Sequence, residues 1–170
     1  MSKFMHRAVA GALVATLGLS AGMAHAAPAT ASATAKARVL KQITVTNTSD
    51  LDFGTIVAGA AASTVAVSNA GGRTCGSGLT CTGTVSSANF DVSGTNNAVV
   101  TITGDNSVSL SNGAGGTMSA SLTRSATTLT LNNGSGTVGG SFQVGGTLSL
   151  AANQADGAYS GTFNVTVDYQ

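Results

Sequence analysis

Apolar and polar residues alternate along much of this chain, most regularly at its C-terminus. Between Tyr159 and Tyr169 the even positions are all polar, and the odd positions are apolar apart from Gly161. A period of two is that of a β-strand with one face on a core and the other in water. We therefore predict a long C-terminal strand. Its apolar face would be formed by Tyr159, Phe163, Val165, Val167 and Tyr169.

Shorter segments of the same kind recur about every ten residues, separated by clusters of Gly, Asn, Asp and Ser. The predicted strands are residues 43–46, 51–57, 63–68, 89–93, 98–103, 107–110, 117–124, 127–131, 141–144 and 147–150. Asn112-Gly113 and Asn133-Gly134 are dipeptides that favour tight turns. No segment after residue 26 has helical periodicity of useful length. This pattern predicts an all-β fold, a sandwich or a barrel.

The segment that precedes these strands also alternates. Alanine occupies every odd position from 29 to 37, and Thr, Ser, Lys or Arg occupies the even positions from 30 to 38. The segment is either a flexible leader or a strand that docks into a groove, its own or a neighbour's. Burying one methyl group contributes only ~0.8 kcal/mol, against ~1.5–3 kcal/mol for Val or Ile. Strong docking would therefore depend on Val39, Leu40, Ile43 and backbone hydrogen bonds.

The first 26 residues have the organisation of a secretory signal peptide. Lys3, His6 and Arg7 give a positive start, an uncharged apolar stretch follows, and Ala24-His25-Ala26 forms a small-x-small cleavage site. The apolar stretch is shorter than the ~20 residues that a membrane-spanning helix needs. We expect export into the periplasm and then to the cell surface or an extracellular filament, with no transmembrane span.

Composition narrows the possible functions of the chain from Ala27 onward. It contains no His, no Glu and no Trp, and its five basic and six acidic residues give a net charge of −1. Acid–base catalysis near neutral pH usually relies on His or a tuned Glu, and zinc sites need His, Cys and carboxylate ligands. Nucleic-acid binding needs a basic surface. We therefore expect no catalytic residues, no metal, no cofactor and no nucleic-acid partner.

Cys75 and Cys81 are the chain's only cysteines. Export to an oxidising compartment predicts a disulfide between them, closing a short loop. A redox or metal motif is disfavoured because no His lies near this pair. Asp50 and Asp52 flank a predicted turn and could touch a cation, although such pairs are more often solvated.

The C-terminal residues resemble the end of a chaperone–usher pilin. Gly157 lies fourteen residues from the end, Tyr169 is penultimate, and alternating apolar residues lie between them. The blocks V-G-G-T-L at 144–148, A-N-Q at 152–154 and the C-terminal strand are similar to spore-coat-U-like domains of the archaic pilin class. With D-F-G-T-I at 52–56, the chain is closer still to the secreted bacterial family called domain of unknown function 4402.

This resemblance implies an immunoglobulin-like, Greek-key antiparallel β-sandwich that lacks its last strand. A periplasmic chaperone would first cover the resulting groove. At an outer-membrane usher, the N-terminal extension of the next subunit would then replace it, so that subunits add head to tail into a homopolymer. The strand that borders the groove and binds subunit or chaperone would contain Gly157, Tyr159, Phe163, Val165, Val167 and Tyr169. The donor strand would contain Ala31, Ala33, Ala35, Ala37, Val39 and Ile43.

Three segments follow from these patterns: a signal peptide at 1–26, an N-terminal extension at 27–41 and one β-sandwich domain at 42–170. The favoured function is that of a structural subunit of a surface filament, with an adhesive role open. The alternative is a free-standing secreted or cell-surface β-sandwich that completes its own fold. An enzyme is disfavoured, because no nucleophile–base pair is identifiable.

Overall fold

The computed structural model describes residues 26–132 and 138–170. The chain divides into two units, residues 1–37 and residues 38–170, and the second is called the β domain below. Residues 26–37 are exposed and form neither helix nor strand. All of the predicted signal peptide except Ala26 lies outside the described residues, as do Asn133 and Gly134 of one predicted turn.

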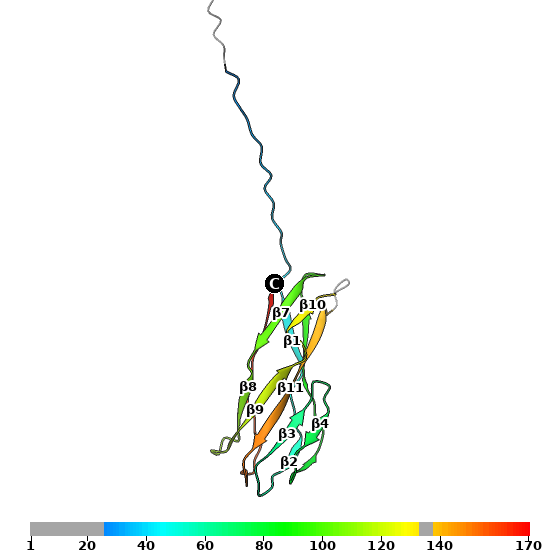
Figure 1. Ribbon diagram of the computed structural model, residues 1–170, viewed down its shortest axis with the longest axis vertical. Coiled ribbons are helices and arrows are strands. Elements are labelled where there is room, and N and C mark those ends of the chain that lie inside the picture. The colour runs from blue at the N-terminus through cyan, green and yellow to red at the C-terminus, as the bar shows by residue number, and fades with distance from the viewer. Residues whose placement is uncertain (1–25, 133–137) are drawn as a thin grey trace, which may run out of the picture. The chain divides into compact units, whose positions relative to one another are not determined.

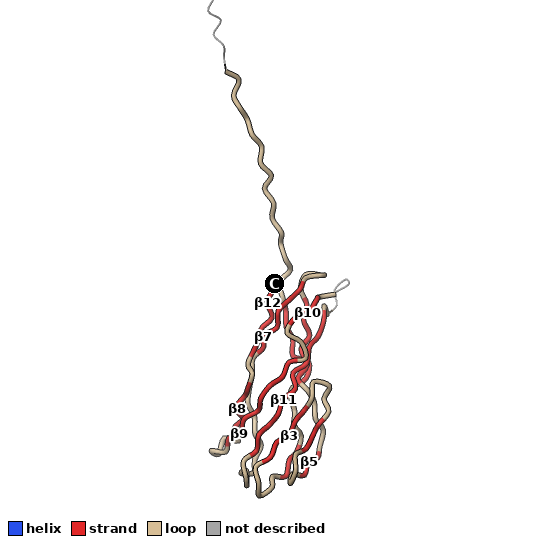
Figure 2. The backbone as a smooth tube through the Cα atoms, viewed as in Figure 1, coloured by secondary structure: helices blue, strands red, loops and turns tan. Residues whose placement is uncertain are grey.

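The described part of the β domain contains twelve β-strands and no helix, which confirms the all-β prediction (Figure 2). Accordingly, no helix able to cross a bilayer occurs among the described residues. The strands are β1 (Thr44–Ser49), β2 (Thr55–Val57), β3 (Ser63–Val67), β4 (Arg73–Cys75), β5 (Thr80–Thr82), β6 (Ala88–Ser93), β7 (Val99–Gly104), β8 (Ser107–Ser111), β9 (Thr117–Arg124), β10 (Thr128–Thr130), β11 (Gly140–Leu150) and β12 (Val165–Tyr169).

The strands form three antiparallel sheets, and the longest strand, β11, organises the largest of them (Figure 1). The first half of β11 pairs with β6 and its second half pairs with β3. β9 pairs with the C-terminal half of β11. β1, β4 and β8 are edge strands of this sheet and pair with β6, β3 and β9, respectively. A second sheet has the order β10-β7-β12, and β2 pairs with β5 in a third.

One apolar core joins the two larger sheets. Phe90 and Phe142, on neighbouring strands of the large sheet, stack with ring centroids 5.2 Å apart. Alternation places every second residue inside, as in β6, where Ala88, Phe90 and Val92 are buried. The small sheet contributes Val100, Ile102 and Val167 to the same cluster. The predicted apolar faces therefore meet in a single core.

Several predicted strand boundaries are wrong. Residues 141–144 and 147–150 belong to one strand, β11. The C-terminal strand begins at Val165 instead of Tyr159, because the amide of Asn164 donates to the Asp105 side chain and only Ser160 forms a bridge before it. Only residues 55–57 of the predicted strand at 51–57 are extended in a sheet. The sequence pattern also missed β4 and β5.

The predicted disulfide between Cys75 and Cys81 is confirmed, with Cα atoms 6.1 Å apart. It joins β4 to β5. Beside it, the Arg73 guanidinium donates to the backbone oxygens of Thr82, at 2.7 Å, and Phe53, at 3.3 Å. The disulfide and Arg73 together tie the β2–β5 sheet, and the Phe53 segment that leads into it, to β4 of the large sheet.

Candidate functional site

β1 and β12 are two of the edge strands of the described β domain, the others being β2, β4, β5, β8 and β10. β1 pairs with β6, and β12 pairs with β7. Both are therefore sheet edges whose remaining backbone N–H and C=O groups are available to another strand. One of these edges belongs to the large sheet and the other to the small sheet, so the core between the sheets lies open on this side.

The two edge strands run in opposite directions. Where β1 begins and β12 ends, the Tyr169 hydroxyl donates to the Lys41 carbonyl oxygen at 2.5 Å and accepts from the Thr95 amide at 2.7 Å. At the other end of both strands, residues 51–58, which follow β1, and residues 154–159, which precede β12, line the same cavity. We call these two places the Tyr169 end and the cavity end.

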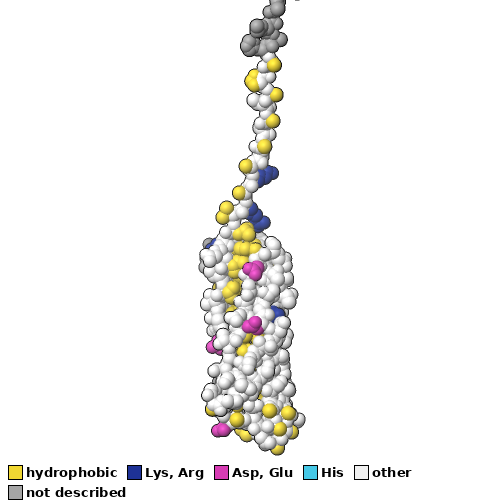
Figure 3. Space-filling model, turned by 90° about the vertical axis from the view of Figure 1, so that its left-hand side faces the viewer, with side chains coloured by type: hydrophobic (Ala, Val, Ile, Leu, Met, Phe, Trp, Pro, Cys, Tyr) yellow, Lys and Arg dark blue, Asp and Glu magenta, His cyan; other side chains and the backbone are white. Residues whose placement is uncertain are grey.

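Between the two ends, apolar side chains are incompletely covered. We call this set the apolar band, and it consists of Ile43, Val45, Phe163, Val165 and Tyr169. Val45 is 37% exposed, and the others are half-buried against the core. The Phe163 ring meets the edge of the Phe90 ring at a centroid distance of 6.3 Å. On the face of the domain drawn in Figure 3, apolar side chains gather in a strip in the upper part and in separate spots below it.

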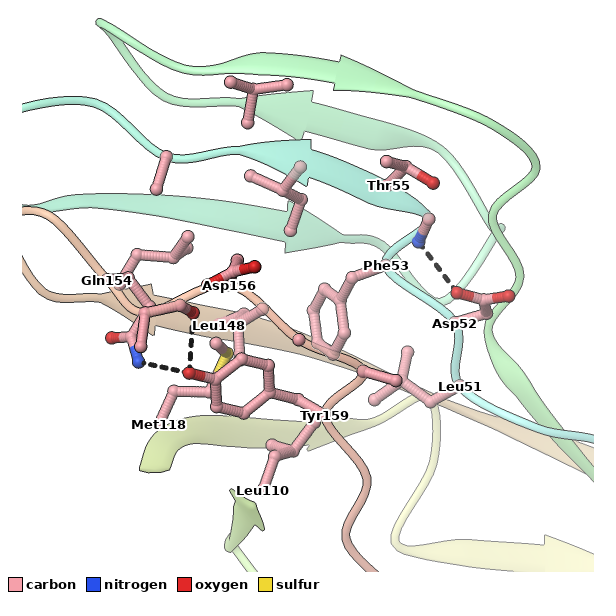
Figure 4. Close-up of a pocket in the computed structure, with 18 residues that line it drawn as sticks. Leu51, Asp52, Phe53, Thr55, Leu110, Met118, Leu148, Gln154, Asp156 and Tyr159 are labelled. Atoms are coloured by element: carbon pink, nitrogen blue, oxygen red, sulfur yellow. Dashed lines mark hydrogen bonds between the residues drawn. The ribbon is translucent and has the colours of Figure 1, made fainter. Parts of the chain in front are cut away.

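The cavity has a volume of about 690 Å³. The rings of Phe53 and Tyr159 project into it, and Leu110, Met118 and Leu148 surround the Tyr159 ring (Figure 4). These side chains come from the segment after β1, the segment before β12, and strands β8, β9 and β11. Its volume falls in the range of protein ligand pockets. Its wall is therefore built by the same two chain segments that flank the apolar band.

Polar contacts fix the cavity wall. The Tyr159 hydroxyl donates to the Ala155 carbonyl oxygen at 2.8 Å, and the Gln154 side-chain amide donates to the Tyr159 hydroxyl oxygen at 2.9 Å (Figure 4). The carboxylate of Asp52 accepts from the Gly54 amide at 2.8 Å. Tyr159 is thus held by its own loop, with its ring directed into the cavity.

No group of three or more potential metal ligands occurs in the described part of the chain. Asp50 and Asp52, the pair considered for a cation, each accept a hydrogen bond from their own segment, from the Asn47 side chain and the Gly54 amide respectively. Their carboxylates therefore act in local turns.

The residues predicted to border a groove fall in two places. Phe163, Val165, Val167 and Tyr169 lie along β12 and the residues just before it, and Tyr159 lies in the cavity wall. Gly157 also lines the cavity, with a backbone φ of +141° that favours glycine. A Cβ atom there would come within 3.1 Å of the Asn112 side chain.

The predicted donor residues are placed differently from one another. Ala31, Ala33, Ala35 and Ala37 lie in the exposed unit that has no secondary structure. Val39 precedes β1 and is 92% exposed. Ile43 instead packs against the core of its own domain, so the segment free to act as a donor ends at Leu40.

Sequence reasoning missed the cavity. Its walls come from residues 51–58 and 154–159, with Leu110, Met118, Leu148 and Leu150, which only the fold brings together. The one sequence signal was the apolar block from Leu51 to Val57, which was assigned to a strand. In the structure, all of residues 51–57 line the cavity, and only residues 55–57 also form a strand.

The fold and the apolar band define an all-β domain in which one edge strand of each main sheet, β1 or β12, borders an incompletely covered strip of the core. Residues 43–169 match the family model described as Domain of unknown function (DUF4402), so the chain belongs to that family. The match confirms the resemblance seen in the blocks at 52–56 and 144–169. No curated protein and no solved structure matches the chain.

Proposed function

We propose that this protein is a pilin-like structural subunit of a bacterial surface filament, with an immunoglobulin-like sandwich completed by a strand from a neighbouring copy. The observation that carries the proposal is the apolar band between the unpaired edges of β1 and β12. Open edges and exposed apolar surface are both costly in water. An added strand would cover the band and pair with a free edge at once.

The occupant that we propose is the N-terminal extension of another copy, residues 27–40. Its alternating Ala and polar residues give it one small apolar face and one solvated face. An extended chain of 14 residues spans up to ~46 Å, longer than the ~33 Å that the segment from Tyr159 to Tyr169 would cover if it were fully extended. The extension is therefore long enough to run the full length of the open side.

Contacts of this kind join unlike surfaces, an extension on one copy and an open side on the next. Such head-to-tail contacts do not close on themselves, and they build a filament. During export, a periplasmic chaperone would cover the open side, and an outer-membrane usher would be the place where the extension replaces it.

The test compares the chain from Ala27 with a chain that starts at Lys41. We expect the longer chain to form multimers in light scattering and filaments by negative-stain microscopy. The shorter chain should not polymerise, and it should bind a synthetic peptide of residues 27–40 in a one-to-one complex with a raised Tm. Two monomeric proteins of equal stability, neither binding peptide, would instead indicate a free-standing β-sandwich.

A further inference from the structure

Resting on the function proposed above, we infer the direction and register of the incoming strand: it runs antiparallel to β12 and places Val39 of one copy in the cavity of the next. The cavity then receives the last residues of the incoming strand, the segment from Ala37 to Leu40 of a second copy.

The first argument is the match between side-chain size and available space. Residues 31, 33, 35, 37 and 39 share one face of an extended strand, and only Val39 among them is larger than Ala. Along the apolar band, Phe163 and Val165 are already half-buried, so small side chains suffice there. The cavity of about 690 Å³ is where larger apolar groups can be buried.

The second argument is the direction of the strands. Running antiparallel to β12, the donor enters at the Tyr169 end and reaches the cavity with its last residues, Val39 and Leu40. With the opposite direction, Ala29 or Ala31 would lie at the cavity and Val39 would lie at the Tyr169 end. All strand pairs among the described residues are antiparallel, and antiparallel pairing is slightly more stable per residue. The inferred direction therefore pairs the donor with the free edge of β12, whereas antiparallel pairing with β1 would reverse the donor and leave Val39 outside the cavity.

The third argument is that the chain's own Val39 cannot reach the cavity of its own β domain. Lys41 is fixed at the Tyr169 end by its hydrogen bonds to Tyr169 and Thr95. Val39 is two residues away and can therefore lie at most ~7 Å from Lys41. The cavity begins about ten residues farther along either β1 or β12 and its adjoining segment, roughly 30 Å away for an extended chain. Only a second copy can bring Val39 there, and in its own chain this side chain is 92% exposed.

The direct test is cross-linking between two variants that each carry one added cysteine besides the Cys75–Cys81 disulfide. Ala158 lines the cavity, is small and is exposed, so Ala158→Cys should leave the fold intact. Mixed under oxidising conditions, Val39→Cys and Ala158→Cys chains should give a covalent dimer on non-reducing gels. Ala31→Cys mixed with Ala158→Cys is the matched control and should give none.

The outcomes separate this inference from the proposed function. Multimers that cross-link through Ala31→Cys would overturn the direction, and multimers that cross-link through neither variant would overturn the assignment of the cavity, while the filament proposal stands in both cases. Chains that remain monomeric throughout would contradict the filament proposal itself, and the inference with it.

Charge substitutions give a second readout that does not depend on cysteine chemistry. Val39→Asp should abolish assembly, because it would bury an unpaired carboxylate in the cavity. Thr34→Asp lies on the opposite face of the donor strand and should leave assembly intact. Val39 is exposed in its own chain, so both variants should keep the Tm of the unassembled β domain. Assembly of Val39→Asp at the level of the unsubstituted chain would refute the assignment.

Discussion

Tyr169 links the beginning and the end of the β domain through a single oxygen atom. Its hydroxyl donates to the Lys41 carbonyl and accepts from the Thr95 amide, so it fixes the chain where β1 begins and β12 ends. The penultimate Tyr was singled out in the sequence by its place in the alternating pattern. The structure adds that its ring packs on the core while its hydroxyl joins three segments.

We predict that Tyr169→Phe lowers the free energy of unfolding by about 1 kcal/mol, the usual net contribution of a hydrogen-bonding group. Urea denaturation of the chain from Lys41 would measure it without interference from assembly. Asp168→Asn is the matched control, since Asp168 is exposed on the opposite face of the strand, and it should change stability by less than ~0.5 kcal/mol. Equal midpoints for the two variants would show that the hydroxyl contributes nothing.

Two glycines illustrate different reasons for lacking a side chain. At Gly161, a Cβ atom would stand 2.3 Å from the Ser109 carbonyl oxygen, so the backbone would have to move. Gly113 has a φ of +73°, but no atom within 4 Å of an added Cβ.

We expect Gly161→Ala to destabilise by about 1–3 kcal/mol, the range for forced overpacking. Gly113→Ala should cost about 1 kcal/mol, from the left-handed backbone alone. Thermal unfolding of both variants measures the difference. The interpretation fails if Gly113→Ala proves the more damaging, because close backbone approach at Gly161 would then not matter.

Among the elements, the alternating segment at residues 117–124 was predicted best. Residues 117–124 form β9 with the predicted bounds, since eight residues of alternation leave little ambiguity. β11 was divided in two at Gly145-Gly146, because glycine usually weakens a strand. In the fold these glycines allow close approach instead: a Cβ at Gly145 would lie 2.5 Å from the Val67 carbonyl oxygen.

The elements that were missed depend on partners distant in the sequence. R-T-C in β4 and T-C-T in β5 are too short and too polar to show an apolar face. They are held by pairing with β3 and β2, by the disulfide, and by Arg73. The cavity was missed for the same reason, because no local pattern records which loops meet.

Replacing both cysteines by serine should lower the free energy of unfolding by about 2 kcal/mol, from the lost constraint on a short loop. Denaturation with and without a thiol reductant tests this. The reduced unsubstituted protein should match the double variant, and the variant should not respond to the reductant. A variant as stable as the oxidised protein would mean that pairing with β2 and β3 suffices to hold β4 and β5.

In our proposal the sandwich lacks one strand, and a strand appended after the C-terminal residue could supply it. Gln170 lies at the Tyr169 end, where the donor would enter, and its amide donates to the Val99 carbonyl oxygen. A second copy of residues 27–40, appended after Gln170 through a short turn, could run down the open side in the inferred direction.

We predict that this extended chain, starting at Lys41, is monomeric and more stable than the chain without the appended segment. Burial of one Val and several Ala side chains should contribute about 3 kcal/mol and raise the Tm by about 10 °C. An appended segment with Asp at the position equivalent to Val39 is the control. Equal melting temperatures for the two appended segments would argue against occupation of the cavity.

The hydrogen bonds of Tyr169 also determine how the domain should respond to mechanical force. Because Lys41 and Tyr169 lie together, a tether attached at residues 41 and 170 would pull the first residues of β1 away from β6 and the last residues of β12 away from β7. The strands would peel apart one hydrogen bond at a time. A tether between residues 41 and 158 would instead pull along the strands and load many hydrogen bonds together. Single-molecule extension should therefore record a lower rupture force for the first attachment than for the second.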